Sequence, residues 1–124
     1  MLEILAERGF PASEVVALAS PRSAGKRVAY GKQSLKVHSL DDYDFTGTDI
    51  ALFSAGGSVS AVHAPRAAAA GAVVIDNTSQ FRYEDDIPLV VAQVNPHAIA
   101  GWRQRGIIAN PNCSTMQLMV ALAP

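Results

Sequence analysis

The sequence is short of cysteine and of net charge. Cys113 is the only cysteine among 124 residues, which excludes an internal disulfide framework and a multi-cysteine metal site. The formal net charge is −1, and the ten Lys and Arg residues are spread along the chain without a run. Because a nucleic-acid surface needs clustered positive charge, we expect no nucleic-acid partner.

Long apolar runs are also missing. No stretch reaches the roughly 20 apolar residues of a bilayer-spanning helix, so we expect no membrane partner. Glu3, Glu7 and Arg8 interrupt the apolar positions near the N-terminus, a pattern unlike a secretory signal. Together with the single cysteine, these absences lead us to expect a reducing, cytoplasmic location.

The composition that remains is that of one folded domain. Hydrophobic residues make up 49% of the chain and charged residues 17%, which is too apolar for a disordered segment. A chain of 124 residues fits one domain and can bury roughly two thirds of its unfolded surface.

Short apolar runs alternate with helical patterns. Continuous apolar runs are typical of strands buried on both faces, and we expect such strands at 15–19, 49–54, 72–76, 88–94 and 107–109. Helical patterns cover 1–8, 59–70 and 96–105, a last helix starts at Asn112, and a hairpin joins 27–30 to 34–38. Pro65 predicts a kink or break in the second helix. This alternation predicts an α/β domain with a mostly parallel sheet.

Polar loops follow four predicted strand ends, where parallel sheets bind their ligands. These loops are 20–26, 54–58, 77–82 and 110–113. The first places Arg22 between Ser20 and Ser23 and lacks the acidic residue that would bind an unphosphorylated ribose. Its positive charge suits the 2′-phosphate of NADP. The alternative is an ordinary solvated loop.

The next two loops also suit anions. In Ser54–Ser58, glycines before a helix let a phosphate approach the backbone, and a plain turn is the alternative. Arg82, in the third loop, can clamp a phosphate or a carboxylate through two N–H groups. The alternative is a surface arginine that pairs with Glu84, Asp85 or Asp86.

Cys113 carries the sharpest signal, because it follows a strand and opens a helix. Free backbone N–H groups and the helix dipole at that point favour the thiolate, which is a nucleophile. Asn112 and Ser114 supply donors for an oxyanion. The alternative is a buried, inert cysteine. No spacing places a histidine beside it, and we interpret all three histidines as structural or surface residues: His38, His63 and His97.

Five motifs occur in one order from about Val15 to the end of the chain. They read Ser-Pro-Arg-Ser-Ala-Gly-Lys, Ala-Leu-Phe-Ser-Ala-Gly-Gly-Ser-Val-Ser, Val-Ile-Asp-Asn-Thr-Ser-Gln-Phe-Arg, Pro-Leu-Val-Val-Ala-Gln-Val-Asn-Pro and Asn-Pro-Asn-Cys-Ser-Thr. Together they resemble aspartate-β-semialdehyde dehydrogenase. Glyceraldehyde-3-phosphate dehydrogenase and N-acetyl-glutamyl-phosphate reductase are less similar around the cysteine. The resemblance implies a Rossmann-like, doubly wound, mostly parallel sheet that binds NADP.

The resemblance also implies a role for each matching residue. Cys113 matches the acyl-thioester nucleophile, Asn112 matches a residue that orients the site, and Arg82 matches the arginine that binds phosphate. The residues implied in NADP binding are Arg22 and Ser23 at the 2′-phosphate with Ser20 nearby, Ala55 and Gly56 along the cofactor, and Asn95 near the nicotinamide.

The implied reaction is NADP-dependent reductive dephosphorylation of L-aspartyl phosphate to L-aspartate 4-semialdehyde, or its reverse, through a thioester on Cys113. The resemblance places this reaction in the synthesis of lysine, methionine and threonine. It also implies small-molecule partners, namely the acyl phosphate, the semialdehyde and phosphate. The family implies a homodimer or a homotetramer for the full-length enzyme.

The chain departs from the family pattern at both ends. Residues 1–124 match part of an NADP-binding domain, without the opening strand and its glycine-rich loop, and stop at the nucleophile helix. Ala92-Gln93 stands where the family has Pro-Glu. Because orphaned backbone groups cost ~1–3 kcal/mol each, we expect this fragment alone to be unstable and inactive. The alternatives are a non-catalytic dinucleotide- or phosphate-binding module and a truncated remnant.

Overall fold

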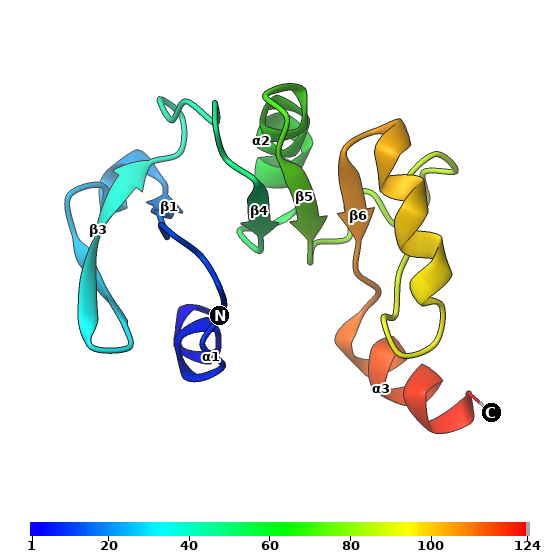
Figure 1. The fold of residues 1–124 in the computed structure, drawn as a ribbon. Helices are drawn as coiled ribbons and strands as arrows, with labels where there is room; N and C mark the ends of the chain where they lie inside the picture. Colours follow the sequence, from blue (N-terminus) through cyan, green and yellow to red (C-terminus); the bar gives the residue numbers. More distant parts are fainter. Residues whose placement is uncertain (124) are drawn as a thin grey trace. The chain divides into compact units, whose positions relative to one another are not determined.

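The computed structural model describes residues 1–123, which fall into two compact units, Met1–Asp44 and Phe45–Pro124. Each unit contains a three-stranded sheet (Figure 1). Helices accompany both sheets, so the predicted α/β class is confirmed.

The first unit, Met1–Asp44, pairs a short parallel ladder with a hairpin. Its elements are α1 (Leu2–Glu7), β1 (Ala17–Ala19), the 3₁₀ helix η1 (Pro21–Ser23), β2 (Arg27–Tyr30) and β3 (Gln33–Ser39). The strand order is β1-β3-β2, in which β1 runs parallel and β2 antiparallel to β3. The predicted hairpin is therefore confirmed, and Arg27 Nε donates a 2.9 Å hydrogen bond across it to Ser34 Oγ.

The second unit, Phe45–Pro124, contains a wholly parallel sheet. Its elements are β4 (Ile50–Phe53), α2 (Gly57–Ala69), β5 (Val73–Asp76), the 3₁₀ helix η2 (Pro96–Gln104), β6 (Ile107–Ala109) and α3 (Cys113–Leu122). The strand order is β4-β5-β6, and α2 lies beside β4 and β5 (Figure 1). The apolar runs predicted as strands at 49–54, 72–76 and 107–109 are confirmed within a residue or two.

The core of the second unit is built from small and branched side chains. Val74 and Ile107 are almost completely buried in neighbouring strands, and every residue of β6 is buried. From α2, Ala64 and Ala67 are fully buried. Such small residues bring the helix axis close to the sheet, which positions the start of α2 at the ends of the strands.

The prediction of a fourth strand at 88–94 is wrong. Only Leu89 forms a β-bridge, with Ala109 of β6. The chain then turns, because Val94 N donates to Val91 O and the Asn95 side chain takes up the backbone N–H of Val91. A side-chain acceptor therefore replaces the neighbouring strand that Val91 would need to continue the ladder.

Of the kink or break predicted at Pro65, the break is absent, because α2 runs from Gly57 to Ala69 without interruption. Pro65 lies on the exposed side of the helix, whereas Ala64 and Ala67 are fully buried. Packing of this buried face against the sheet outweighs the loss of one helical hydrogen bond.

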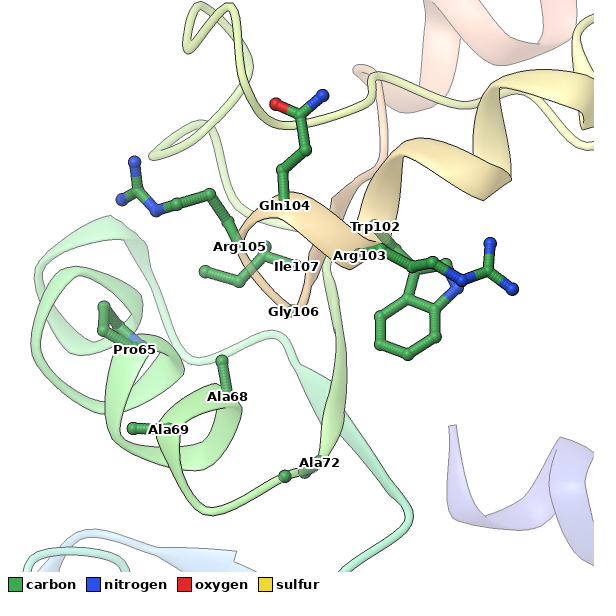
Figure 2. A pocket seen from close by; sticks show the side chains of 11 residues that line it. Pro65, Ala68, Ala69, Ala72, Trp102, Arg103, Gln104, Arg105, Gly106 and Ile107 are labelled. Carbon is green, nitrogen blue, oxygen red and sulfur yellow. The ribbon is translucent and has the colours of Figure 1, made fainter.

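Gly106 marks the tightest approach between α2 and the sheet. Its φ of +70° is a conformation that other L-residues rarely adopt, and a Cβ there would lie 2.8 Å from Ala68 Cβ. Figure 2 shows Gly106 at the bend before β6, with Ala68 facing it from α2. Glycine is therefore required here both by the backbone conformation and by the space.

We expect Gly106→Ala to lower the free energy of unfolding by about 2 kcal/mol, because the added methyl group strains the backbone and overlaps Ala68. Urea unfolding of the polypeptide that carries these residues measures the loss. Gly57→Ala is the matched control, because its φ is not positive and its nearest new contact, Gln80 Oε1, is 3.6 Å away. Equal stability of the two variants would contradict the packing described here.

Candidate functional site

The carboxyl ends of β4, β5 and β6 lie level at one edge of the parallel sheet. Phe53 pairs with Asp76, and Asp76 pairs with Ala109. The ladder continues one step beyond the strands, because Asn77 N donates to Phe53 O at 2.9 Å and Asn110 N donates to Asp76 O at 2.8 Å. The loops that follow the three strands therefore begin side by side, where parallel sheets bind ligands.

A buried carboxylate anchors the middle loop. Asp76 is completely buried, and its two oxygens accept hydrogen bonds from Ser60 Oγ (2.9 Å), Thr78 N (3.1 Å) and Thr78 Oγ1 (2.7 Å). These donors compensate the cost of burying the charge. Because Ser60 lies in α2, the carboxylate ties the start of that helix to the loop that begins at Asn77.

The turn between β4 and α2 leaves a helix start open. Gly56 is the N-cap of α2 with φ +105°, and no side chain caps the helix. Ala55 and Gly56 are exposed. The first backbone N–H groups of α2 are thus without a side-chain cap, which is compatible both with an anion site and with the plain turn that is the alternative.

Arg82 bridges the ends of β5 and β6. Its Nε donates to Asn110 O at 2.9 Å and its Nη2 donates to Asn77 O at 3.1 Å. Among residues 1–123 it forms no ion pair, whereas Asp86 is paired with Arg105 at 2.8 Å. The structure therefore contradicts the alternative that Arg82 is a surface arginine paired with the acidic residues after it.

Cys113 is exposed and is the first residue of α3. Asn112 caps this helix, because its Oδ1 accepts a 2.9 Å hydrogen bond from Ser114 N. The Cys113 sulfur lies 3.8 Å from the same oxygen. The alternative of a buried cysteine is contradicted, and the thiol is open to a reactant.

Three of the predicted site residues lie in the first unit. Ser20 follows β1, and Arg22 and Ser23 lie in η1, where Ser23 N donates to Ser20 O at 2.8 Å. The Arg22 side chain is exposed and has no hydrogen-bond or ion-pair partner within residues 1–123. The segment predicted as a polar loop is thus a short 3₁₀ turn that presents one unpaired guanidinium.

Asn95 has a different environment from the other predicted residues. Its Oδ1 accepts from Val91 N at 2.7 Å and its Nδ2 donates to Leu89 O at 3.0 Å. Both ends of the amide therefore hold the loop before η2. The role near the nicotinamide that the resemblance implies stays a prediction.

The histidines lie on separate elements. His38 and His97 are exposed on β3 and η2, and His63 Nδ1 lies 2.7 Å from Arg66 Nη1 on α2. Within the described part of the chain, no group of three or more His, Cys, Asp or Glu side chains could hold a metal ion. No helix of residues 1–123 is both long enough and apolar enough to cross a membrane.

Sequence reasoning missed the pairing of Asn77 with Asn110. Asn110 Nδ2 donates a 2.6 Å hydrogen bond to Asn77 Oδ1 between two loops 33 residues apart. A signal was present, because each asparagine directly follows a predicted buried strand. Recognising it required the register of β5 and β6, which only the fold supplies.

A shallow groove of about 460 Å³ lies at the other edge of the sheet. Figure 2 shows its lining from the end of α2, the start of β5 and the bend before β6, including Pro65, Ala72 and Trp102. None of the predicted site residues contributes to it. The candidate site is therefore the edge that carries Arg82 and Cys113.

Comparison with known proteins connects this arrangement to a family. Residues 1–102 match the family model described as semialdehyde dehydrogenase, NAD binding domain. Aspartate-semialdehyde dehydrogenase 2 of Vibrio cholerae is 58% identical over 124 residues, which cover all of this chain and 37% of that protein. The chain thus spans little more than a third of the length of this relative.

Solved structures agree with the family match. The crystal structure of aspartate semialdehyde dehydrogenase II complexed with ASA from Vibrio cholerae has a TM-score of 0.96 at 58% identity, covering 99% of this chain and 40% of that one. The Candida albicans aspartate semialdehyde dehydrogenase with NADP has a TM-score of 0.79 at 26% identity, covering 99% of this chain and 41% of that one. These structural neighbours support a Rossmann-type fold for this chain. On these grounds, the chain belongs to the NAD-binding domain family of the semialdehyde dehydrogenases.

Proposed function

We propose that this chain forms the cofactor-binding domain of an enzyme that reduces L-aspartyl phosphate to L-aspartate 4-semialdehyde with NADPH. The observation that carries the proposal is the placement of Cys113. The thiol is exposed at the start of α3, three residues after the carbonyl of Asn110 that holds Arg82. The proposed nucleophile and the proposed phosphate-binding cation are therefore connected through Asn110.

In this proposal the Cys113 sulfur attacks the acyl carbon of aspartyl phosphate. A carbon–sulfur bond forms, the bond from carbon to the phosphate oxygen breaks, and phosphate leaves with the electron pair. Arg82 holds that phosphate, since its Nη1 has no acceptor among residues 1–123. The product on the enzyme is a thioester.

The start of α3 assists this step. The same region supplies donors for the oxygen that becomes negative when sulfur adds to the carbonyl. Asn112 keeps the helix start ordered through its bond to Ser114 N, which holds Cys113 in position.

The residues at the other strand ends fit a nicotinamide dinucleotide. When bound, the reduced cofactor supplies the hydride that converts the thioester to the aldehyde. Ala55 and Gly56 let its phosphates approach the open start of α2. We propose NADP rather than NAD, because the Arg22 guanidinium is unpaired between Ser20 and Ser23 and no acidic residue lies in that turn.

The remaining parts of the proposal concern the whole protein. Among residues 1–123 the Cys113 sulfur contacts the Asn112 side chain and no general base. A full catalytic cycle, and with it lysine, methionine and threonine synthesis, is therefore expected where this domain is joined to the remainder of a full-length dehydrogenase. Homodimeric or homotetrameric assembly and a cytoplasmic location belong to the same proposal.

We expect iodoacetamide to label Cys113 rapidly at pH 7, and inorganic phosphate to slow the labelling. Arg82→Gln should raise the phosphate concentration for half-protection about tenfold, because it removes a charge-assisted contact. Mass spectrometry of the Cys113 peptide gives the rates. Arg103→Gln, an exposed arginine of η2, is the matched control. Labelling only after denaturation would favour the non-catalytic module.

We expect Arg22→Ala to weaken NADP binding tenfold or more and to leave NAD binding nearly unchanged, because only NADP carries the 2′-phosphate. Calorimetric titration of both cofactors measures the ratio of affinities. Arg8→Ala removes an exposed arginine elsewhere in the first unit and should alter neither affinity. Equal loss of NAD and NADP affinity in Arg22→Ala would argue against NADP selection by this residue.

A further inference from the structure

The Asn77–Asn110 amide pair joins the two strand ends that carry the proposed phosphate-binding and nucleophilic residues. The two asparagines follow Asp76 and Ala109, which are partners in the β5–β6 register. Their side chains are linked by a 2.6 Å hydrogen bond, and the Asn110 N–H bonds to Asp76 O. This side-chain hydrogen bond therefore links the chain segments after β5 and β6, beyond the last backbone hydrogen bond between them.

The main-chain oxygens of the same two asparagines hold the Arg82 guanidinium. Nε and Nη2 donate to the main-chain oxygens of Asn110 and Asn77, so both asparagines hold the same side of the guanidinium. The N–H groups of Nη1 and the second N–H of Nη2 have no acceptor among residues 1–123. Two adjacent donors of this kind match two oxygens of a phosphate.

The acceptors that hold Arg82 are neutral, which preserves its charge. Within residues 1–123 Arg82 forms no ion pair, and Asp86 pairs with Arg105 instead. An arginine held by two carbonyls is fixed in direction and yet keeps a full positive charge for an anion.

The same pair sets the position of Cys113. Only Pro111 and Asn112 separate Asn110 from the cysteine, and Pro111 is buried with a restricted φ. A displacement of Asn110 therefore moves both the carbonyl that holds Arg82 and the start of α3. The placement of Arg82 relative to Cys113 therefore depends on Asn110, together with Asn77, whose carbonyl oxygen accepts from Nη2.

We propose that Asn77 and Asn110 are positioning residues for phosphate recognition, and that their mutual hydrogen bond fixes the Arg82 guanidinium relative to Cys113. The inference rests on the proposed function, because it takes phosphate as the group that Arg82 binds. It assigns to the amide pair no contact with substrate or cofactor.

A double-mutant cycle tests the proposal. Asn77→Ala, Asn110→Ala and the double variant are compared by the phosphate concentration that half-protects Cys113 from iodoacetamide, in the polypeptide that carries these residues. We expect each single variant to raise that concentration about tenfold and the double variant to raise it no further, because one shared bond is lost. Protection by NADP should not change.

The control for lost stability is Ile107→Val, which removes one buried methylene from the same strand β6 and leaves both amides intact. It should lower the melting temperature without altering phosphate protection. If it weakens phosphate protection as much as Asn110→Ala does, or if the two asparagine effects simply add, the amide pair has no positioning role.

Asn77→Leu provides a second test if the alanine variants unfold through loss of side-chain volume. It keeps a side chain of similar size but has no acceptor for Asn110 Nδ2, so it should raise the phosphate concentration for half-protection about tenfold, as Asn77→Ala does. Unchanged protection in this variant would overturn the proposal. If phosphate fails to protect Cys113 even in the unsubstituted protein, the proposed function fails too, whereas protection that survives all asparagine substitutions refutes only this inference.

Discussion

The candidate site depends on the parallel register that places Phe53, Asp76 and Ala109 side by side. Parallel strands end at a common edge, so three loops distant in the sequence start within hydrogen-bonding distance of one another. Asn77 and Asn110 bond across that edge, and Arg82 reaches both. A shift of register by one residue would separate these groups and turn buried side chains outward.

Buried polar groups hold the loop after β5 in place. Asp76 is held by Ser60 and Thr78, so its carboxylate connects α2 with the loop that carries Arg82. A fully hydrogen-bonded buried carboxylate rigidifies its surroundings, because any movement leaves a costly unpaired charge. Arg82 is bound by carbonyl oxygens alone, which leaves its charge available to an anion.

Several elements could be predicted from local pattern. The apolar runs at 49–54, 72–76 and 107–109 are strands because branched and small apolar residues fill the sheet, in which β6 is wholly buried and β4 buries alternate residues. The exposed Cys113 at a helix start follows from Asn112, which is a strong N-cap residue. The strand predicted at 88–94 is wrong because Asn95 bonds back to Val91 and Leu89. The pattern of apolar residues does not reveal this contact.

The sequence by itself determined the class of fold, the strands of the parallel sheet and the residue types that carry the chemistry, because these depend on periodicity, capping and side-chain chemistry along short stretches. Only the tertiary structure decided which of those residues meet. Arg82 turns to Asn77 and Asn110 instead of to the acidic residues next to it, because the β5–β6 register brings two carbonyl oxygens within its reach while Asp86 is paired with Arg105. Contacts between positions 28 and 33 residues apart depend on strand pairing, which no local pattern contains.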